Sequence, residues 1–163
     1  MGGGFHTFWA SSVVYVALLP LLVAAHELGH AGVVLARSQA RVTVNLGRTP
    51  AKWRFSLGRI DFALHPDFWL HRGPPGSARP HDRLDVWSTV ALGLAGPLAD
   101  AFAAGIVVLV GVTTNTAVVG DAGLVGVALA FGSLLPFRVR GRDTDGANIL
   151  RVLRYSRKAR RTS

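Results

Sequence analysis

The stretch from Phe8 to Ala36, FWASSVVYVALLPLLVAAHELGHAGVVLA, decides the fold expected for this chain. Its only charged or strongly polar residues are His26, Glu27 and His30. An apolar run of more than about 18 residues is typical of a transmembrane helix. Ionisable side chains cost free energy inside a membrane, so these three residues indicate a functional site.

The spacing of the three residues predicts a metal centre. Residues four apart lie on one face of an α-helix, so the imidazoles of His26 and His30 can bind one cation. Glu27 lies about 100° round the helix and can reach a water molecule on that cation. The metal lowers the pKa of such a water to about 7, and the carboxylate takes its proton. A chance occurrence of this short motif is the alternative, and the apolar surroundings argue against it.

Composition and charge favour a small membrane protein. Half of the 163 residues are hydrophobic, 17% are charged, and the mean hydropathy is +0.35. All 18 Lys and Arg residues lie in two segments, Arg37 to Arg83 and Arg138 to Arg161. This segregation predicts a cell-membrane protein with its N-terminus outside and both basic segments in the cytoplasm, and it argues against nucleic acid as a partner. The chain has no cysteine, so any zinc must be held by histidine and carboxylate.

The fold class expected is a membrane all-α protein with about three transmembrane helices in a single domain. The spans are predicted at residues 8–36, 86–112 and 117–137. If Asp121 stays at the outer surface, the apolar part of the third segment has only about 16 residues. We therefore expect its helical form to end around Pro136.

Two further elements are expected on the cytoplasmic side. Within residues 37–85, alternating runs from Arg41 to Leu64 predict two to four antiparallel strands. Such a sheet either offers an edge to an extended peptide or only packs on the helix ends, and both interpretations stay open. Within residues 138–163, the pattern predicts an amphipathic helix from Ala147, lying on the anionic inner leaflet.

Other polar and small residues give weaker signals. The second span carries a small-residue face that lets another helix approach closely, formed by Gly93, Ala95, Gly96 and Ala99. Asp100, the only charge in that span, could be protonated and structural, could orient a ligand, or could bind the metal. Three histidines lack helical spacing to one another and are interpreted as surface residues: His65, His71 and His81.

Four motifs in this order resemble the site-2 protease family of intramembrane zinc metallopeptidases: HELGH, VNLGRTP, AGPLAD and LLPFRVRGRDTDGANIL. The resemblance runs from about Val13 to Leu153, and the chain has room for that family's membrane core without a PDZ or CBS domain. It implies a zinc endopeptidase, with one Zn²⁺ per chain, that cleaves within or next to the transmembrane segments of membrane proteins. The expected partners are therefore such substrates and the lipid bilayer.

The resemblance also implies roles for individual residues. His26 and His30 would be zinc ligands, Glu27 the general base and Asp145 the third protein ligand, with the attacking water in fourth place. The residues alone also favour Asp145 over Asp100, because the metal is expected about 10 to 16 Å from the basic boundary, nearer the chain end that carries Asp145. Asp143 is the third choice.

Two predicted substrate-binding residues come from departures from the family pattern. The family commonly has asparagines at the positions of Asp100 and Ser133, and they are thought to contact the substrate. Two other functions remain open. The chain could be an inactive relative that binds membrane proteins as a scaffold, or a membrane metal-binding or transport protein. Both leave Glu27 without a reason to be buried.

Overall fold

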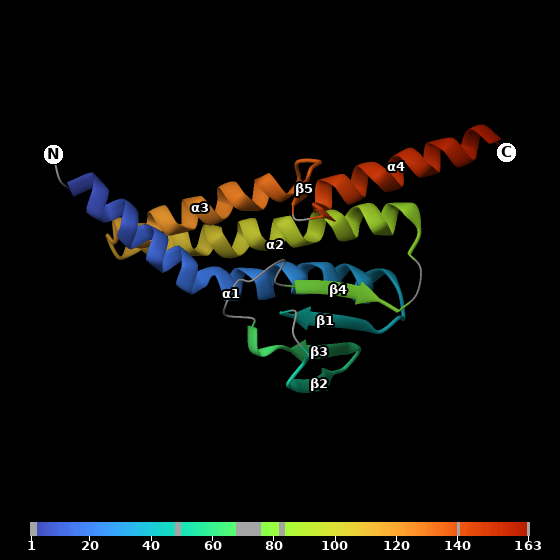
Figure 1. Cartoon of the computed structure of the whole chain (residues 1–163), viewed down its shortest axis with the longest axis horizontal. Helices are drawn as coiled ribbons and strands as arrows, with labels where there is room; N and C mark the ends of the chain where they lie inside the picture. Colours follow the sequence, from blue (N-terminus) through green and yellow to red (C-terminus); the bar gives the residue numbers. More distant parts are fainter. Residues whose placement is uncertain (1–2, 48–49, 68–75, 82–83, 140, 163) are drawn as a thin grey trace.

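Four helices and six strands make up the part of the chain that the computed structural model describes, residues 3–47, 50–67, 76–81, 84–139 and 141–162 (Figure 1). The helices are α1 (Gly3–Arg37), α2 (Val86–Thr113), α3 (Ala117–Ser133) and α4 (Asp145–Thr162). The strands are β1 (Val42–Leu46), β2 (Trp53–Leu57), β3 (Ile60–Leu64), β4 (Gly76–Pro80), β5 (Arg138–Val139) and β6 (Arg142–Asp143). The chain is therefore mostly helical, with a small sheet between α1 and α2, as the sequence predicts.

The helices α1, α2 and α3 lie side by side along the long axis of the molecule (Figure 1). Small residues bring α1 and α2 close together. A Cβ atom on Gly29 would lie 2.5 Å from the carbonyl oxygen of Ala95 and 2.7 Å from Cβ of Ala99. The small-residue face predicted for the second span is thus confirmed as a helix contact.

Two of the described helices are long and apolar enough to cross a membrane, α1 from Trp9 onward and α2. Only about a fifth of their apolar windows is buried, and side chains such as Phe102 (73% exposed) and Val112 (71%) point outward. Such large exposed apolar surfaces are compatible with a lipid environment. The helix α3 has 17 residues and is shorter than a full span. It ends at Ser133, so helical form stops shortly before Pro136, close to where the sequence predicts.

The four-stranded sheet has the order β2-β3-β1-β4. The strand β1 is antiparallel to β4 but parallel to β3, which corrects the prediction of a purely antiparallel sheet. The strand β4 lies outside the range from Arg41 to Leu64 for which the sequence predicts strands, because GSARP has no apolar alternation. Alternation predicts which face of a strand is buried, but it does not predict which strand is its neighbour.

The hydrophobic core joins the sheet to the second half of α1. The strand β1 buries Val42, Val44 and Leu46 on one face, and these side chains pack with Ala31 and Val34 of α1. Burying one such side chain stabilises the fold by about 1.5–3 kcal/mol. Figure 1 shows the result: β4 lies beside the half of α1 that carries the histidine motif.

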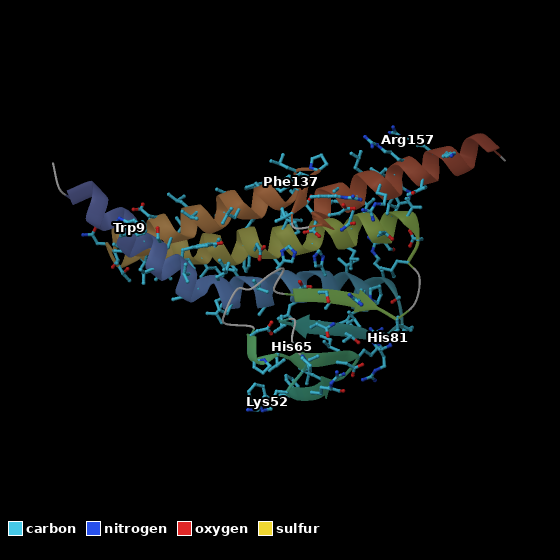
Figure 2. All side chains as sticks on the ribbon, in the orientation of Figure 1. Trp9, Lys52, His65, His81, Phe137 and Arg157 are labelled. Carbon is cyan, nitrogen blue, oxygen red and sulfur yellow. The ribbon has the colours of Figure 1, made fainter. Side chains whose placement is uncertain are left out.

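The helix α4 begins at Asp145, two residues before the predicted start. The hydroxyl of Thr144 accepts a hydrogen bond from the amide of Ala147 (3.3 Å), which caps the first turn. Ile149 then packs so tightly on α2 that a Cβ on Gly93 would lie 2.6 Å from its Cγ1. This part of the apolar face of α4 is therefore covered by α2 and is not available to lipid. In Figure 2, Arg157 of α4 lies far from Trp9 of α1 along the molecule.

Candidate metal centre

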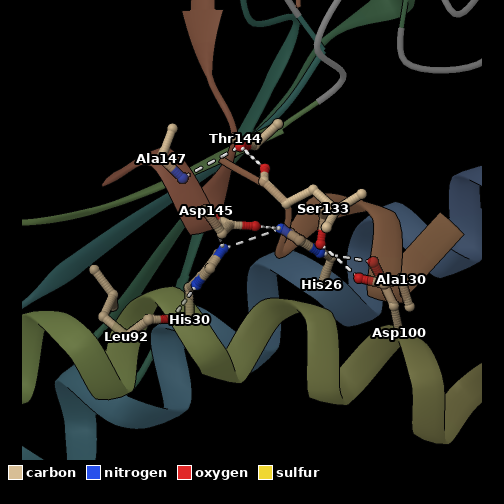
Figure 3. A network of polar contacts seen from close by, with 10 residues as sticks. His26, His30, Leu92, Asp100, Ala130, Ser133, Thr144, Asp145 and Ala147 are labelled. Atoms are coloured by element: carbon tan, nitrogen blue, oxygen red, sulfur yellow. Dashed lines mark hydrogen bonds and ion pairs between the residues drawn. The ribbon is translucent and has the colours of Figure 1, made fainter. Parts of the chain in front are cut away.

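The two histidines of the motif form the centre of the site. They lie one turn apart on α1, and their Nε2 atoms are 3.0 Å apart (Figure 3). The side chains are only 19% exposed for His26 and 10% for His30. The predicted pairing of the two imidazoles on one helix face is confirmed.

The Nδ1 atoms of both rings are held by α2. The Nδ1 atom of His30 donates to the carbonyl oxygen of Leu92 (2.6 Å), which can only accept. The Nδ1 atom of His26 donates to Oδ2 of Asp100 (2.7 Å). Because a neutral imidazole carries one proton, these bonds leave lone pairs on both Nε2 atoms, and the lone pairs face each other.

The carboxylate of Asp145 converges on the same point from the first turn of α4. Its Oδ2 lies 3.2 Å from Nε2 of His26, and its Oδ1 lies 3.5 Å from Nε2 of His30. The next residue, Gly146, has no room for a Cβ, because the backbone carbonyl of Leu134 occupies that position. The Asp-Gly pair thus allows α4 to begin against the end of α3, which brings the carboxylate to the histidines.

The neighbouring Asp143 has different partners. It pairs with Arg138 (2.5 Å) and with Arg151 and therefore ties the β5–β6 hairpin to α4. Asp143, the third choice as a ligand, is thus engaged away from the histidine pair.

The three groups fit a zinc ion. Tetrahedral zinc with ligands at about 2.0–2.1 Å places its ligand atoms about 3.3 Å apart. Here the two Nε2 atoms are 3.0 Å apart, and each lies close to a different oxygen of Asp145, at 3.2 and 3.5 Å. With one ligand atom from each residue, the three atoms lie within 4.8 Å of one another. Lone pairs of the two imidazoles and of the carboxylate point to the same position and would repel one another. A proton or a cation must therefore lie between them. A Cβ on Gly96 would come within 2.5 Å of Nε2 of His30 and 2.7 Å of Nε2 of His26, so the glycine keeps this space open.

Glu27 lies beside the pair and is 6% exposed. The backbone amide of Ala78 in β4 interacts with its carboxyl group, and its Oε2 atom is buried without a hydrogen-bond partner in the described part of the chain. A buried carboxylate oxygen without a partner is costly. It is therefore available to a group that enters the site, such as a water molecule.

A cavity of about 600 Å³ opens on this centre. Its apolar lining comes from α1 and α3, with Tyr15, Leu19, Leu22 and Leu129 among the side chains, and Ser77 and Ala78 line it from β4. Asp100 and Ser133 also line the cavity, and the hydroxyl of Ser133 donates to the carbonyl of Ala130 (2.7 Å). Their contact with a substrate stays a prediction.

Two of the other histidines, His65 and His81, lie away from the centre (Figure 2). His81 forms a hydrogen bond to Thr43 at the sheet (2.9 Å), and His65 follows β3. Figure 2 places both on the sheet side of the molecule. His71 lies outside the described residues.

Sequence reasoning missed three parts of this site: the Leu92 carbonyl, the space at Gly96 and the strand β4. A signal existed for the first two, because residues 92, 96 and 100 lie four apart and share one face of α2. The sequence of β4 carries no such signal.

Comparison with models of known protein families finds no match for this chain, and comparison with curated proteins finds none.

Proposed function

We propose that this chain is an intramembrane zinc metalloendopeptidase of the site-2 protease type. It would hydrolyse peptide bonds within or next to the transmembrane segments of other membrane proteins. The observation that carries this proposal is the convergence of His26, His30 and Asp145 beside the buried Glu27, on a helix that is otherwise apolar. Both non-catalytic alternatives leave the unpartnered oxygen of Glu27 without a role.

The residues of the chain have distinct tasks in this reaction. Zinc, when bound to His26, His30 and Asp145, supplies a Lewis acid that polarises the scissile carbonyl and acidifies a water molecule. Glu27 accepts the proton of that water at its carboxylate and delivers it to the leaving amine, as a general base and then a general acid. Apolar side chains of α1 and α3 line part of the cavity beside the site and limit the water around this transfer.

Among the described strands, β4 has a neighbour only on its β1 side, and this free edge would give the substrate a place to bind. Successive residues of a strand point their backbone groups to opposite edges. The amide of Ala78 reaches Glu27, so its N–H and C=O lie on the edge opposite to β1. A transmembrane helix hides its carbonyls in its own hydrogen bonds and must unwind to be cut. The unwound segment would add to β4 as a further strand, next to the centre.

The arrangement in the membrane follows from charge and apolar surface. The helices α1 and α2 would span the bilayer, with the shorter α3 beside them. The two basic segments would lie in the cytoplasm and the N-terminus outside. The metal centre would then lie below the headgroups but within reach of water from the cytoplasmic side.

The test compares the purified wild type with Glu27→Gln and His30→Ala. Each is analysed for zinc and co-expressed with a panel of single-span membrane proteins. We expect about one zinc per chain for the wild type and for Glu27→Gln, and loss of zinc for His30→Ala. Glu27→Gln should lower cleavage at least about 100-fold. Asp121→Asn, which neutralises an exposed carboxylate on α3, should behave as the wild type.

Two results would contradict the proposal. Equal processing by the wild type and by Glu27→Gln would reject the chemistry and favour a scaffold. Zinc flux across vesicles that depends on His30 but not on Glu27 would favour a transporter.

A further inference from the structure

The helix α2 holds the two imidazoles in two different ways. Nδ1 of His30 donates to a backbone carbonyl, that of Leu92, whereas Nδ1 of His26 donates to a side chain, that of Asp100. We propose that Asp100 is a positioning residue: it fixes the ring of His26 so that its Nε2 atom is presented to the metal. This inference rests on the proposed function.

The geometry of the two antiparallel helices carries the argument. Leu92, Gly96 and Asp100 lie four residues apart on one face of α2, opposite His30 and His26 four residues apart on α1. This face of α2 therefore has two hydrogen-bond acceptors, one for each imidazole ring. Between the acceptors lies Gly96, where a Cβ would approach both Nε2 atoms. Figure 3 shows the ring of His26 between Asp100 and Asp145.

The chemistry of Asp100 suits this role. The distance of 2.7 Å lies in the range of hydrogen bonds to a carboxylate, and it is similar to the 2.6 Å between His30 and the Leu92 carbonyl. A carboxylate only accepts, so it imposes the Nδ1–H tautomer and leaves the lone pair on Nε2. An unpaired carboxylate on an apolar helix would be costly, and the bond to His26 gives it a partner. Its other oxygen, Oδ1, is buried without a partner in the described part of the chain.

The asymmetry makes the role testable. No side-chain substitution removes the Leu92 carbonyl, whereas Asp100→Ala removes the only acceptor seen at Nδ1 of His26 among the described residues. Asp100→Asn keeps the shape, but its amide can accept or donate and no longer enforces one tautomer. Loss of a partner behind a metal-binding histidine typically weakens metal binding about 10- to 100-fold.

The experiment measures metal affinity and not proteolysis. Wild type, Asp100→Ala, Asp100→Asn and the control Asp121→Asn are purified in detergent and stripped with a chelator. Each is titrated with Zn²⁺ against a chromogenic competitor and with Co²⁺ by visible absorption. We expect about 10- to 100-fold weaker Zn²⁺ binding for Asp100→Ala, an intermediate loss for Asp100→Asn, and no change for Asp121→Asn. The Co²⁺ bands should shift in both Asp100 variants, which a merely structural residue would not cause.

The outcomes separate this inference from the proposed function. If the wild type binds Zn²⁺ and both Asp100 variants bind it equally well, Asp100 does not position His26, although the metalloprotease proposal stands. If the wild type binds no Zn²⁺, the proposed function fails and this inference fails with it. Should Asp100→Ala not fold, the affinity and Co²⁺ spectrum of Asp100→Asn decide the matter.

Discussion

A Cβ atom on Gly96 would lie 2.5 Å from Nε2 of His30. Real Cβ atoms do not approach a nitrogen that closely, so Gly96→Ala must push the imidazoles apart or occupy the space between them. We expect at least about a 10-fold loss of Zn²⁺ affinity, of the size seen when metal ligands are misplaced. Competition with a chromogenic chelator measures it.

The matched control for this prediction is Gly105→Ala on the same helix, where a Cβ meets nothing within 4 Å. Alanine is favoured over glycine in a helix by about 1 kcal/mol, so this variant should keep its metal and gain slightly in stability. Equal Zn²⁺ affinities for the two variants would contradict a metal centre beneath Gly96.

Ala78→Pro tests the free edge of β4. Proline lacks the N–H, which at this residue faces Glu27 and not β1. The ladder between β4 and β1 should therefore survive, since proline is tolerated where the N–H points away from the sheet. We expect at least about a 10-fold loss of substrate cleavage with unchanged zinc content, because this variant removes the N–H that contacts the Glu27 carboxyl group and would face an added strand. Ala78→Val keeps the N–H and should retain cleavage, and wild-type cleavage by Ala78→Pro would argue against strand addition at this edge.

The orientation in the membrane can be tested cleanly because the chain has no cysteine. Gln39 follows α1 in a basic segment, and Ala117 is exposed at the start of α3. An impermeant maleimide should label Ala117→Cys in intact cells and should label Gln39→Cys only after permeabilisation. The reverse pattern would contradict the orientation but not the metal centre.

The sheet should lose stability in acid through Asp61. Hydrogen bonds from Arg41 (2.5 and 3.0 Å) and from Ser56 (2.6 Å) hold the pKa of this carboxyl well below its usual range. Because the folded-state pKa is depressed, its stabilising contribution is present above the unfolded-state pKa of about 4 and is lost as the pH falls toward the folded-state pKa. The melting temperature of the wild type should thus exceed that of Asp61→Asn at pH 7 by a small amount, because the pair is solvent-exposed.

The measurement for Asp61 is a thermal melt of both proteins in detergent at pH 7 and at pH 3. The difference between them should shrink in acid. A difference that grows at pH 3 would show that the Arg41–Asp61 pair does not stabilise the folded state.

Much of the helical framework and the first three strands could be predicted from the sequence, but the fourth strand and the pairing of the strands could not. The apolar runs predicted the positions of α1 and α2, and the small residues around Ala95 predicted a contact with another helix. The strand β4 was missed because its pairing with β1, and not its composition, makes it a strand. The parallel pairing of β1 with β3 was missed for the same reason. Strand order depends on contacts between distant segments, which alternation does not encode.

The sequence by itself determined the pairing of His26 and His30, because four residues on a helix fix their relative position locally. It also determined the apolar lengths of α1 and α2 and the segregation of basic residues. The sequence favours Asp145 as the third ligand, but only the tertiary structure shows that it meets the histidines, with Asp100 behind His26 and Asp143 between arginines. The reason is physical: the contacts of Asp100 and Asp145 with the histidines join segments 74 or more residues apart, and packing at glycines sets their distances.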